Sequence, residues 1–201
     1  MNAPSSHGLS FDGVLLAAGK SSRMGTDKAC LALRDGRLLW QRQHSMLVEA
    51  GARRVFLSVR RDQDWAAGEI HCVHDTVPGA GPIAGILAAF ERSTASHLFV
   101  LAVDLPWLPV DWLRELAREC RVDSGACGRL ADGSFEPLAS VYPRSWMAGW
   151  RDAMLGGGRS LQRLLASAGD RGKLFTRPVA PREEAWFHNL NRPRDLDDRT
   201  L

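Results

Sequence analysis

The sequence predicts an α/β fold in which a mostly parallel sheet is covered by helices on both faces. Three observations support this prediction. Strongly apolar runs recur along the chain, and each run ends in polar, loop-forming residues. Segments with helical spacing of apolar residues lie between these runs, so that strand-like and helix-like segments alternate. The chain of 201 residues is 45% hydrophobic and 24% charged, which is enough to bury the core of such a fold.

The first half of the chain contains the elements with the clearest patterns. Apolar residues fill the expected strands because a parallel strand between two helical layers is buried on both faces. We expect strands at residues 14–18, 54–59, 70–73 and 97–103. We expect helices at residues 38–50, 82–92 and 110–120.

The second half is less regular. The turn sequence Ala131-Asp132-Gly133-Ser134 lies between two short apolar runs and predicts a hairpin of residues 126–130 and 137–142, an insert that could shape a second substrate pocket. Helices at 145–154 and 160–168, a strand at 173–179 and a last helix beginning at Pro193 follow. Since no linker interrupts the chain, we expect a flexible tail at residues 1–10 and a single domain at residues 11–201.

Composition excludes several classes of protein. A net charge of +3 is too small for the dense basic surface of a duplex-binding protein but suits a pocket for a small phosphorylated anion. The four cysteines are scattered without a C-x-x-C pair, so neither a zinc site nor a disulfide framework is expected. The small net charge therefore predicts no nucleic-acid partner. No apolar run approaches ~18 residues, so we expect no membrane span and a cytoplasmic location.

The stretch LLAAGKSSRMGTDK, residues 15–28, contains Gly19-Lys20-Ser21 and resembles the end of a P-loop. A P-loop needs an earlier glycine five positions before Gly19, but Val14 stands there. What remains is a strand that leads into a loop of small and basic residues. Gly19 and Gly25 can offer backbone N–H groups to phosphates, and Arg23 and Lys28 can offer positive charge. An ordinary surface loop with solvated basic side chains is the alternative interpretation.

Polar residues at strand ends form the second set of candidates. Ligands of an open parallel sheet bind beyond the carboxyl ends of its strands, where Ser58, Asp75 and Asp104 fall. A carboxylate at such a place can bind Mg²⁺ or cap a helix or turn. Gly81 and Gly85 would let the backbone approach a flat group such as a base, although close helix packing explains Gly85 better.

Four stretches together resemble one family: LLAAGKSSRMGTDKACLAL, PGAGPIAGI, VLAVDLPWLP and FHNLNRPRDL. They are similar to the molybdenum cofactor guanylyltransferases of the MobA type, and the similarity runs from about Gly13 to Leu196. It implies a three-layer α/β/α sandwich with a Rossmann-like sheet of the nucleotide-diphospho-sugar transferase type. It also implies a Mg²⁺-assisted transfer of GMP from GTP to the phosphate of molybdopterin, with molybdoenzymes or their chaperones as further partners.

The resemblance also implies residue roles. Catalysis would fall to Lys28, Arg23 and Asp104, and Mg²⁺ would be bound by Asp104 with Asn191, near Asn189. The nucleotide would be bound by Leu16, Ala17, Ala18, Gly19, Arg23, Lys28, Ser58, Asp75, Gly81 and Asp104. The regions around Glu136-Pro137 and Gly158-Arg159-Ser160 would face the pterin. Because the acceptor phosphate is already an anion, no protein nucleophile or strong base is required.

Two departures keep other donors open. Ala18 replaces a glycine that is usual in the guanylyl branch, and Ser58 replaces a frequent asparagine. Alanine at the first position is usual in the cytidylyltransferases of the same cofactor. A CTP-dependent enzyme, another nucleotidyltransferase and a non-catalytic nucleotide-binding protein are therefore the alternatives.

Overall fold

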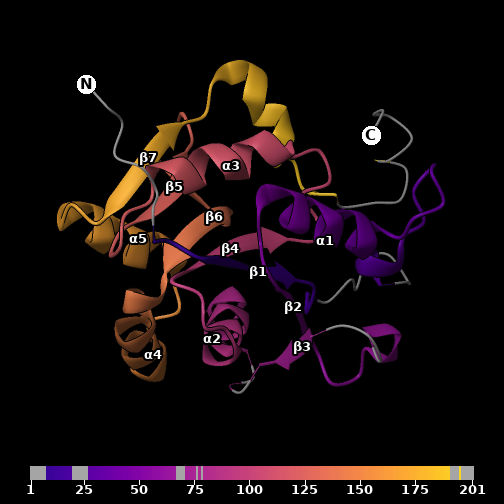
Figure 1. Ribbon diagram of the computed structural model, residues 1–201, viewed down its shortest axis with the longest axis horizontal. Coiled ribbons are helices and arrows are strands. Elements are labelled where there is room, and N and C mark those ends of the chain that lie inside the picture. The colour runs from indigo at the N-terminus through magenta and orange to yellow at the C-terminus, as the bar shows by residue number, and fades with distance from the viewer. Residues whose placement is uncertain are drawn as a thin grey trace.

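The computed structural model describes residues 8–19, 27–66, 71–75, 77, 79–190 and 195. Within these residues seven strands form one sheet in the order β3-β2-β1-β4-β6-β5-β7 (Figure 1). The strands are β1 Phe11–Leu16, β2 Val55–Val59, β3 His71–His74, β4 His97–Ala102, β5 Gly125–Arg129, β6 Phe135–Pro143 and β7 Leu174–Pro178. The helices are α1 Leu39–Ala50, α2 Pro82–Arg92, α3 Val110–Glu119, α4 Met147–Leu155 and α5 Leu161–Asp170.

The sheet is mixed, and its parallel half contains the first four strands. β3, β2, β1 and β4 run parallel to their neighbours. β6 pairs antiparallel with β4, and β5 pairs antiparallel with β6. The predicted hairpin is therefore present, and it continues the main sheet beyond β4. β7 then adds to β5 in parallel.

Helices cover both faces of the sheet, as the sequence predicts (Figure 1). Neighbouring residues of one strand belong to different hydrophobic cores, because successive side chains point to opposite faces of the sheet. Leu15 and Leu57 belong to the core that contains residues of α1 and α3. Val14 and Phe56 belong to the core that contains residues of α2, α4 and α5. The three-layer α/β/α prediction is confirmed.

β1 begins three residues earlier than the apolar pattern predicts, because a charged residue lies inside it. Asp12 is fully buried, and its carboxylate accepts a 2.7 Å hydrogen bond from Ser93 Oγ. Arg53 and Arg54 form ion pairs with it at 3.4 and 3.5 Å. These partners offset the cost of burying a charge, so the strand continues through Asp12.

The remaining boundaries lie close to the predicted ones. α2 has the predicted bounds, and α1 has 12 residues. None of the described helices is long and apolar enough to cross a bilayer. The expected helix at Pro193 falls outside the described residues, and the division into a tail and a single domain stays a prediction.

Candidate functional site

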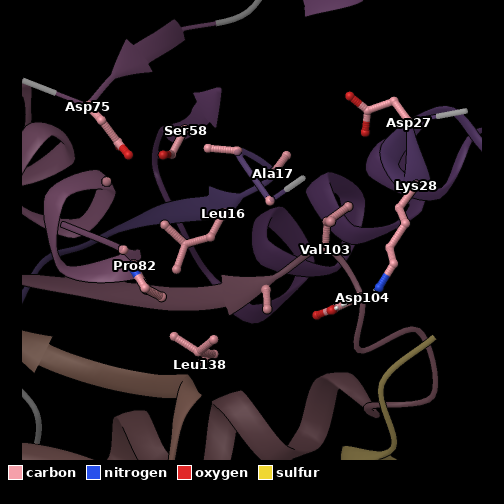
Figure 2. A pocket seen from close by; sticks show the side chains of 15 residues that line it. Leu16, Ala17, Asp27, Lys28, Ser58, Asp75, Pro82, Val103, Asp104 and Leu138 are labelled. Carbon is pink, nitrogen blue, oxygen red and sulfur yellow. Dashed lines mark hydrogen bonds and ion pairs between the residues drawn. The ribbon is translucent and has the colours of Figure 1, made fainter. Parts of the chain in front are cut away.

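A cavity of about 310 Å³ lies at the carboxyl ends of the four parallel strands (Figure 2). This is the edge where the open-sheet rule expects a ligand. Its lining combines small residues, backbone and a few charged side chains. The lining residues are Leu16, Ala17, Ala18, Gly19, Asp27, Lys28, Ser58, Asp75, Gly81, Pro82, Gly85, Ala102, Val103, Asp104 and Leu138.

The end of β1 contributes main chain to the cavity wall. The Ala17 N–H donates to the Ser58 carbonyl at 2.9 Å, and the Val103 N–H donates to the Leu16 carbonyl at 3.1 Å. Ladder hydrogen bonds thus continue past the strand and fix the first residues of the wall. Small side chains there leave room for a ligand to approach the backbone.

A cation and a carboxylate meet at one end of the cavity. Lys28 Nζ lies 3.4 Å from Asp104 Oδ2, and the two side chains are 18% and 28% exposed. Asp27 holds the short 3₁₀ helix Lys28–Cys30 in place, because its carboxylate accepts from the Ala29 N–H at 3.1 Å. A lysine can bind phosphate as a point charge, and a carboxylate can bind a divalent cation. This end of the cavity therefore suits a metal-bound phosphate chain.

The donor set at Asp104 fits Mg²⁺. This ion takes one or two carboxylates and completes its shell with substrate phosphates and water. In the described part of the chain, no three or more His, Cys, Asp or Glu side chains gather into a metal site. A cation here would therefore depend on the ligand's own oxygens together with Asp104.

The opposite end of the cavity carries Asp75 beside Ser58 (Figure 2). Burial raises the pKa of Asp75, and the neighbouring His74 opposes that rise. Asp75 Oδ1 is buried and has no hydrogen-bond partner among the described residues. Buried acceptors are normally satisfied, so this oxygen indicates a donor that a ligand would bring.

Two glycines shape the wall next to α2. Gly81 precedes the helix with φ of 74°, in the region that favours glycine. A Cβ at Gly85 would collide with Ser58 Oγ and lie 2.9 Å from Leu16 Cδ2. Close helix packing is therefore the correct explanation of Gly85, and it brings α2 against the ends of β1 and β2.

Glu136 on β6 adds a titrating carboxyl beside this region. Burial raises the pKa of Glu136 to about 7. The hydrogen bond that Glu136 Oε1 accepts from the Leu138 N–H at 3.3 Å lowers this pKa, and the negative charge of Asp104 raises it further. At neutral pH the group is therefore partly protonated. Ionisation of Glu136 is therefore less favourable in the folded protein than in the unfolded chain, where the carboxylate is hydrated.

Replacing Glu136 by glutamine is expected to remove a pH dependence of stability. The pKa of Glu136 in the folded protein lies above the ordinary value of 4.5. The protonated side chain therefore contributes its whole stabilising effect below pH 4.5, and this contribution is lost as the pH rises through about 7. The stability of the glutamine variant relative to wild type should rise by about 1–3 kcal/mol between pH 4.5 and pH 8.5. Urea unfolding at several pH values measures this, with the exposed Glu49→Gln as control. A difference that stays constant with pH would contradict it.

The predicted site residues fall into two groups. Nine of them line the cavity described above: Leu16, Ala17, Ala18, Gly19, Lys28, Ser58, Asp75, Gly81 and Asp104. Arg23 and Asn191 lie outside the described residues. Asn189 is exposed, and its neighbour Leu190 donates its N–H to the Asp104 carbonyl at 2.8 Å, which places Leu190 at the Asp104 end of the cavity. The binding roles of all these residues stay predictions.

Asp27, Val103 and Leu138 also line the cavity, and they are not among the predicted site residues. Asp27 and Val103 each precede a predicted site residue, and this adjacency was the available signal. Leu138 carried no signal, because it reaches the cavity only through the antiparallel pairing of β6 with β4. The predicted pterin-facing residue Arg159 lies at the exposed surface, where its Nη1 donates to the Gly79 carbonyl at 2.9 Å.

The chain is similar to known proteins in both sequence and fold. The family model of the MobA-like NTP transferase domain matches residues 13–172. The probable molybdenum cofactor guanylyltransferase of Opitutus terrae is 42% identical over 96% of each chain. The molybdenum cofactor guanylyltransferase of Rhizobium rhizogenes is 30% identical over 92% of this chain and 88% of its own length. A crystal structure of molybdopterin-guanine dinucleotide biosynthesis protein A from Archaeoglobus fulgidus has a TM-score of 0.70 and 22% identity over 93% of this chain and 95% of that one.

Proposed function

This chain belongs to the MobA-like NTP transferase family, and we propose that it transfers GMP from GTP to the phosphate of molybdopterin with release of pyrophosphate. The observation that carries the proposal is a single cavity with two chemically different ends. One end holds the Lys28–Asp104 pair, and the other holds the unsatisfied oxygen of Asp75. A nucleoside triphosphate has the matching polarity, with phosphates at one end and a hydrogen-bonding base at the other.

The Asp75 end supports guanine as the base. The Watson–Crick edge of guanine presents two adjacent donors, a ring N–H and an amino group. Cytosine presents only its amino group as a donor on that edge. A carboxylate with a buried oxygen to which none of the described residues donates is therefore better satisfied by guanine.

The chemistry needs positioning and charge neutralisation more than proton transfer. The acceptor phosphate attacks the α-phosphorus of GTP, and the bond to the bridging oxygen of pyrophosphate breaks. Lys28 would neutralise charge on the phosphates, and Asp104 would hold Mg²⁺. When bound, Mg²⁺ would supply charge stabilisation to the phosphate oxygens. Arg23 is proposed as a second phosphate cation.

The acceptor would enter from the side of β6 and the loop before α5. Leu138 lines the cavity there, and Arg159 lies against the Gly79 carbonyl just before α2. An exposed guanidinium at this mouth suits an anionic pterin phosphate. We propose that the product passes to molybdoenzymes or their chaperones in the cytoplasm.

Thermal unfolding with four nucleotides tests the donor. GTP with Mg²⁺ at about 100 times its Kd should stabilise the protein by about 2.7 kcal/mol, which raises Tm by roughly 5–10 °C. CTP, ATP and UTP should give smaller shifts, and omission of Mg²⁺ should reduce the GTP effect. A larger shift with CTP would favour the cytidylyltransferase alternative that Ala18 suggests. Absence of any shift, or of pyrophosphate release with GTP and molybdopterin, would overturn the proposal.

A further inference from the structure

A short segment outside the cavity contacts the backbone that precedes residues 20–26 and the Asp27 side chain that follows them. We name this segment, residues 60–65, the brace; it follows β2 directly. Neither Arg60 nor Gln63 is among the residues that line the cavity. Their polar groups nevertheless bond to residues that do, so the brace can affect a bound ligand only through those residues.

Arg60 binds the main chain at the end of β1. Its Nη1 donates to the carbonyls of Ala18 and Gly19 at 2.9 and 3.0 Å. In a trans peptide the N–H points opposite to the C=O of the same unit. Because the Ala18 carbonyl points to Arg60, the Gly19 N–H must point away from it. Arg60 thus fixes the direction of a backbone donor in the cavity wall.

Gln63 links the two sides of residues 20–26. Its side chain is buried, and Nε2 donates to the Ala17 carbonyl at 3.0 Å and to Asp27 Oδ2 at 2.5 Å. Its Oε1 accepts from the Arg60 N–H at 2.6 Å. Both partners of Nε2 are oxygens and the partner of Oε1 is an N–H, so the amide has only one orientation that satisfies all three bonds. Gln63 therefore joins the end of β1 to Asp27 through one rigid group.

Trp65 completes the brace at Asp27. Its Nε1 donates to Asp27 Oδ2 at 2.9 Å, while Asp27 Oδ1 accepts from the Ala29 N–H. The Trp65 ring stacks on Trp40 of α1, with centroids 6.0 Å apart and planes at 30°. The carboxylate of Asp27 is thus shared between the brace and the 3₁₀ helix that begins at Lys28.

We propose that Gln63 and Arg60 are positioning residues for the triphosphate, because they hold the main chain at Ala18 and Gly19 and the start of the Lys28 helix in one fixed arrangement. This inference rests on the proposed function, since it assumes that these groups bind phosphates. It assigns to the brace a role in phosphate affinity rather than in base recognition. The base end of the cavity, at Asp75, has no bond to Arg60 or Gln63 in the described residues.

Calorimetric titration of the full chain with GTP and with GMP, both with Mg²⁺, tests this role. Gln63→Met keeps the length of the side chain and removes its three hydrogen bonds. It should weaken GTP binding about tenfold and GMP binding much less, so that the preference for GTP over GMP falls. In the transfer assay, KM for GTP should rise in the same variant. Arg60→Met should act in the same direction, and Arg60→Lys should restore part of the affinity because an ammonium can still donate to both carbonyls.

Ser93→Ala is the matched control. It removes buried hydrogen bonds to Asp12 and Ala95 at the amino ends of the strands, so it should lower Tm without changing the GTP-to-GMP preference. An unchanged preference in Gln63→Met, or an equal change in Ser93→Ala, would overturn the inference. If Gln63→Met does not fold, the comparison of Arg60→Met with Arg60→Lys decides. Failure of the wild-type protein to bind GTP would instead count against the proposed function itself.

Discussion

Replacing Asp104 by asparagine is expected to lower the rate of GMP transfer by about 10³-fold or more, with the fold retained. The carboxylate is partly exposed at the cavity, and its described ion-pair partner is Lys28. Asparagine keeps the shape of the side chain and removes the charge that would hold Mg²⁺. The Asp104 backbone carbonyl still accepts from the Leu190 N–H, so Leu190 remains bound beside it.

Initial rates of pyrophosphate release with GTP, Mg²⁺ and molybdopterin measure this effect. Asp111→Asn is a suitable control, because Asp111 is an exposed aspartate on α3 that pairs only with Arg114 among the described residues. The control should keep full activity, and both variants should melt within a few degrees of wild type. Activity of Asp104→Asn within about tenfold of wild type would remove Asp104 from the metal-binding role.

Replacing Lys28 by methionine should have the second largest effect, a loss of about 10²–10³-fold in kcat/KM for GTP. Methionine preserves the length and packing of the side chain but removes the ammonium that meets Asp104 at 3.4 Å. The phosphates would lose a positive charge in a partly buried site, where charge interactions are stronger than in bulk water. Lys28→Arg should recover only part of the activity, since a planar guanidinium has a different shape.

Steady-state kinetics over a range of GTP concentrations measures the Lys28 effect. Lys173→Met is the control, because Lys173 also pairs with an aspartate, Asp123, but lies exposed outside the cavity. A similar loss in both variants would point to a general charge effect. Unchanged kinetics in Lys28→Met would exclude a role for this lysine in phosphate binding.

Much of the fold could be predicted because buried positions recur in the sequence with the spacing of a strand or of a helix. Strands packed on both faces are continuous apolar runs, and the helices between them have one apolar side. Asp12 interrupts such a run, and it still lies in a strand because its partners, Arg54 and Ser93, come from 42 and 81 residues further along the chain. The order of the strands was likewise not predictable, since the register of β6 against β4 depends on contacts across the sheet.

The candidate site could be predicted to the extent that it depends on chain direction. Residues that follow parallel strands must share one edge, and for this reason Asp75 and Asp104 line the same cavity as Lys28. The contacts of the brace could not be predicted from the direction of the strands. Gln63 and Trp65 follow a different strand from the one that leads to Asp27, and only the folded chain brings their donors to its carboxylate.

The buried carboxylate of Asp12 lies at the opposite edge of the sheet from the cavity, and this separation has a consequence for variation of the protein. Substitutions around Asp12 should reduce the yield of soluble protein, whereas substitutions of the partly exposed Lys28 and Asp104 side chains in the cavity should leave yield intact and change turnover. A mutational scan would therefore divide into two spatially distinct sets of positions. Charged side chains at the cavity can therefore change without loss of the interactions of Asp12 that stabilise the fold.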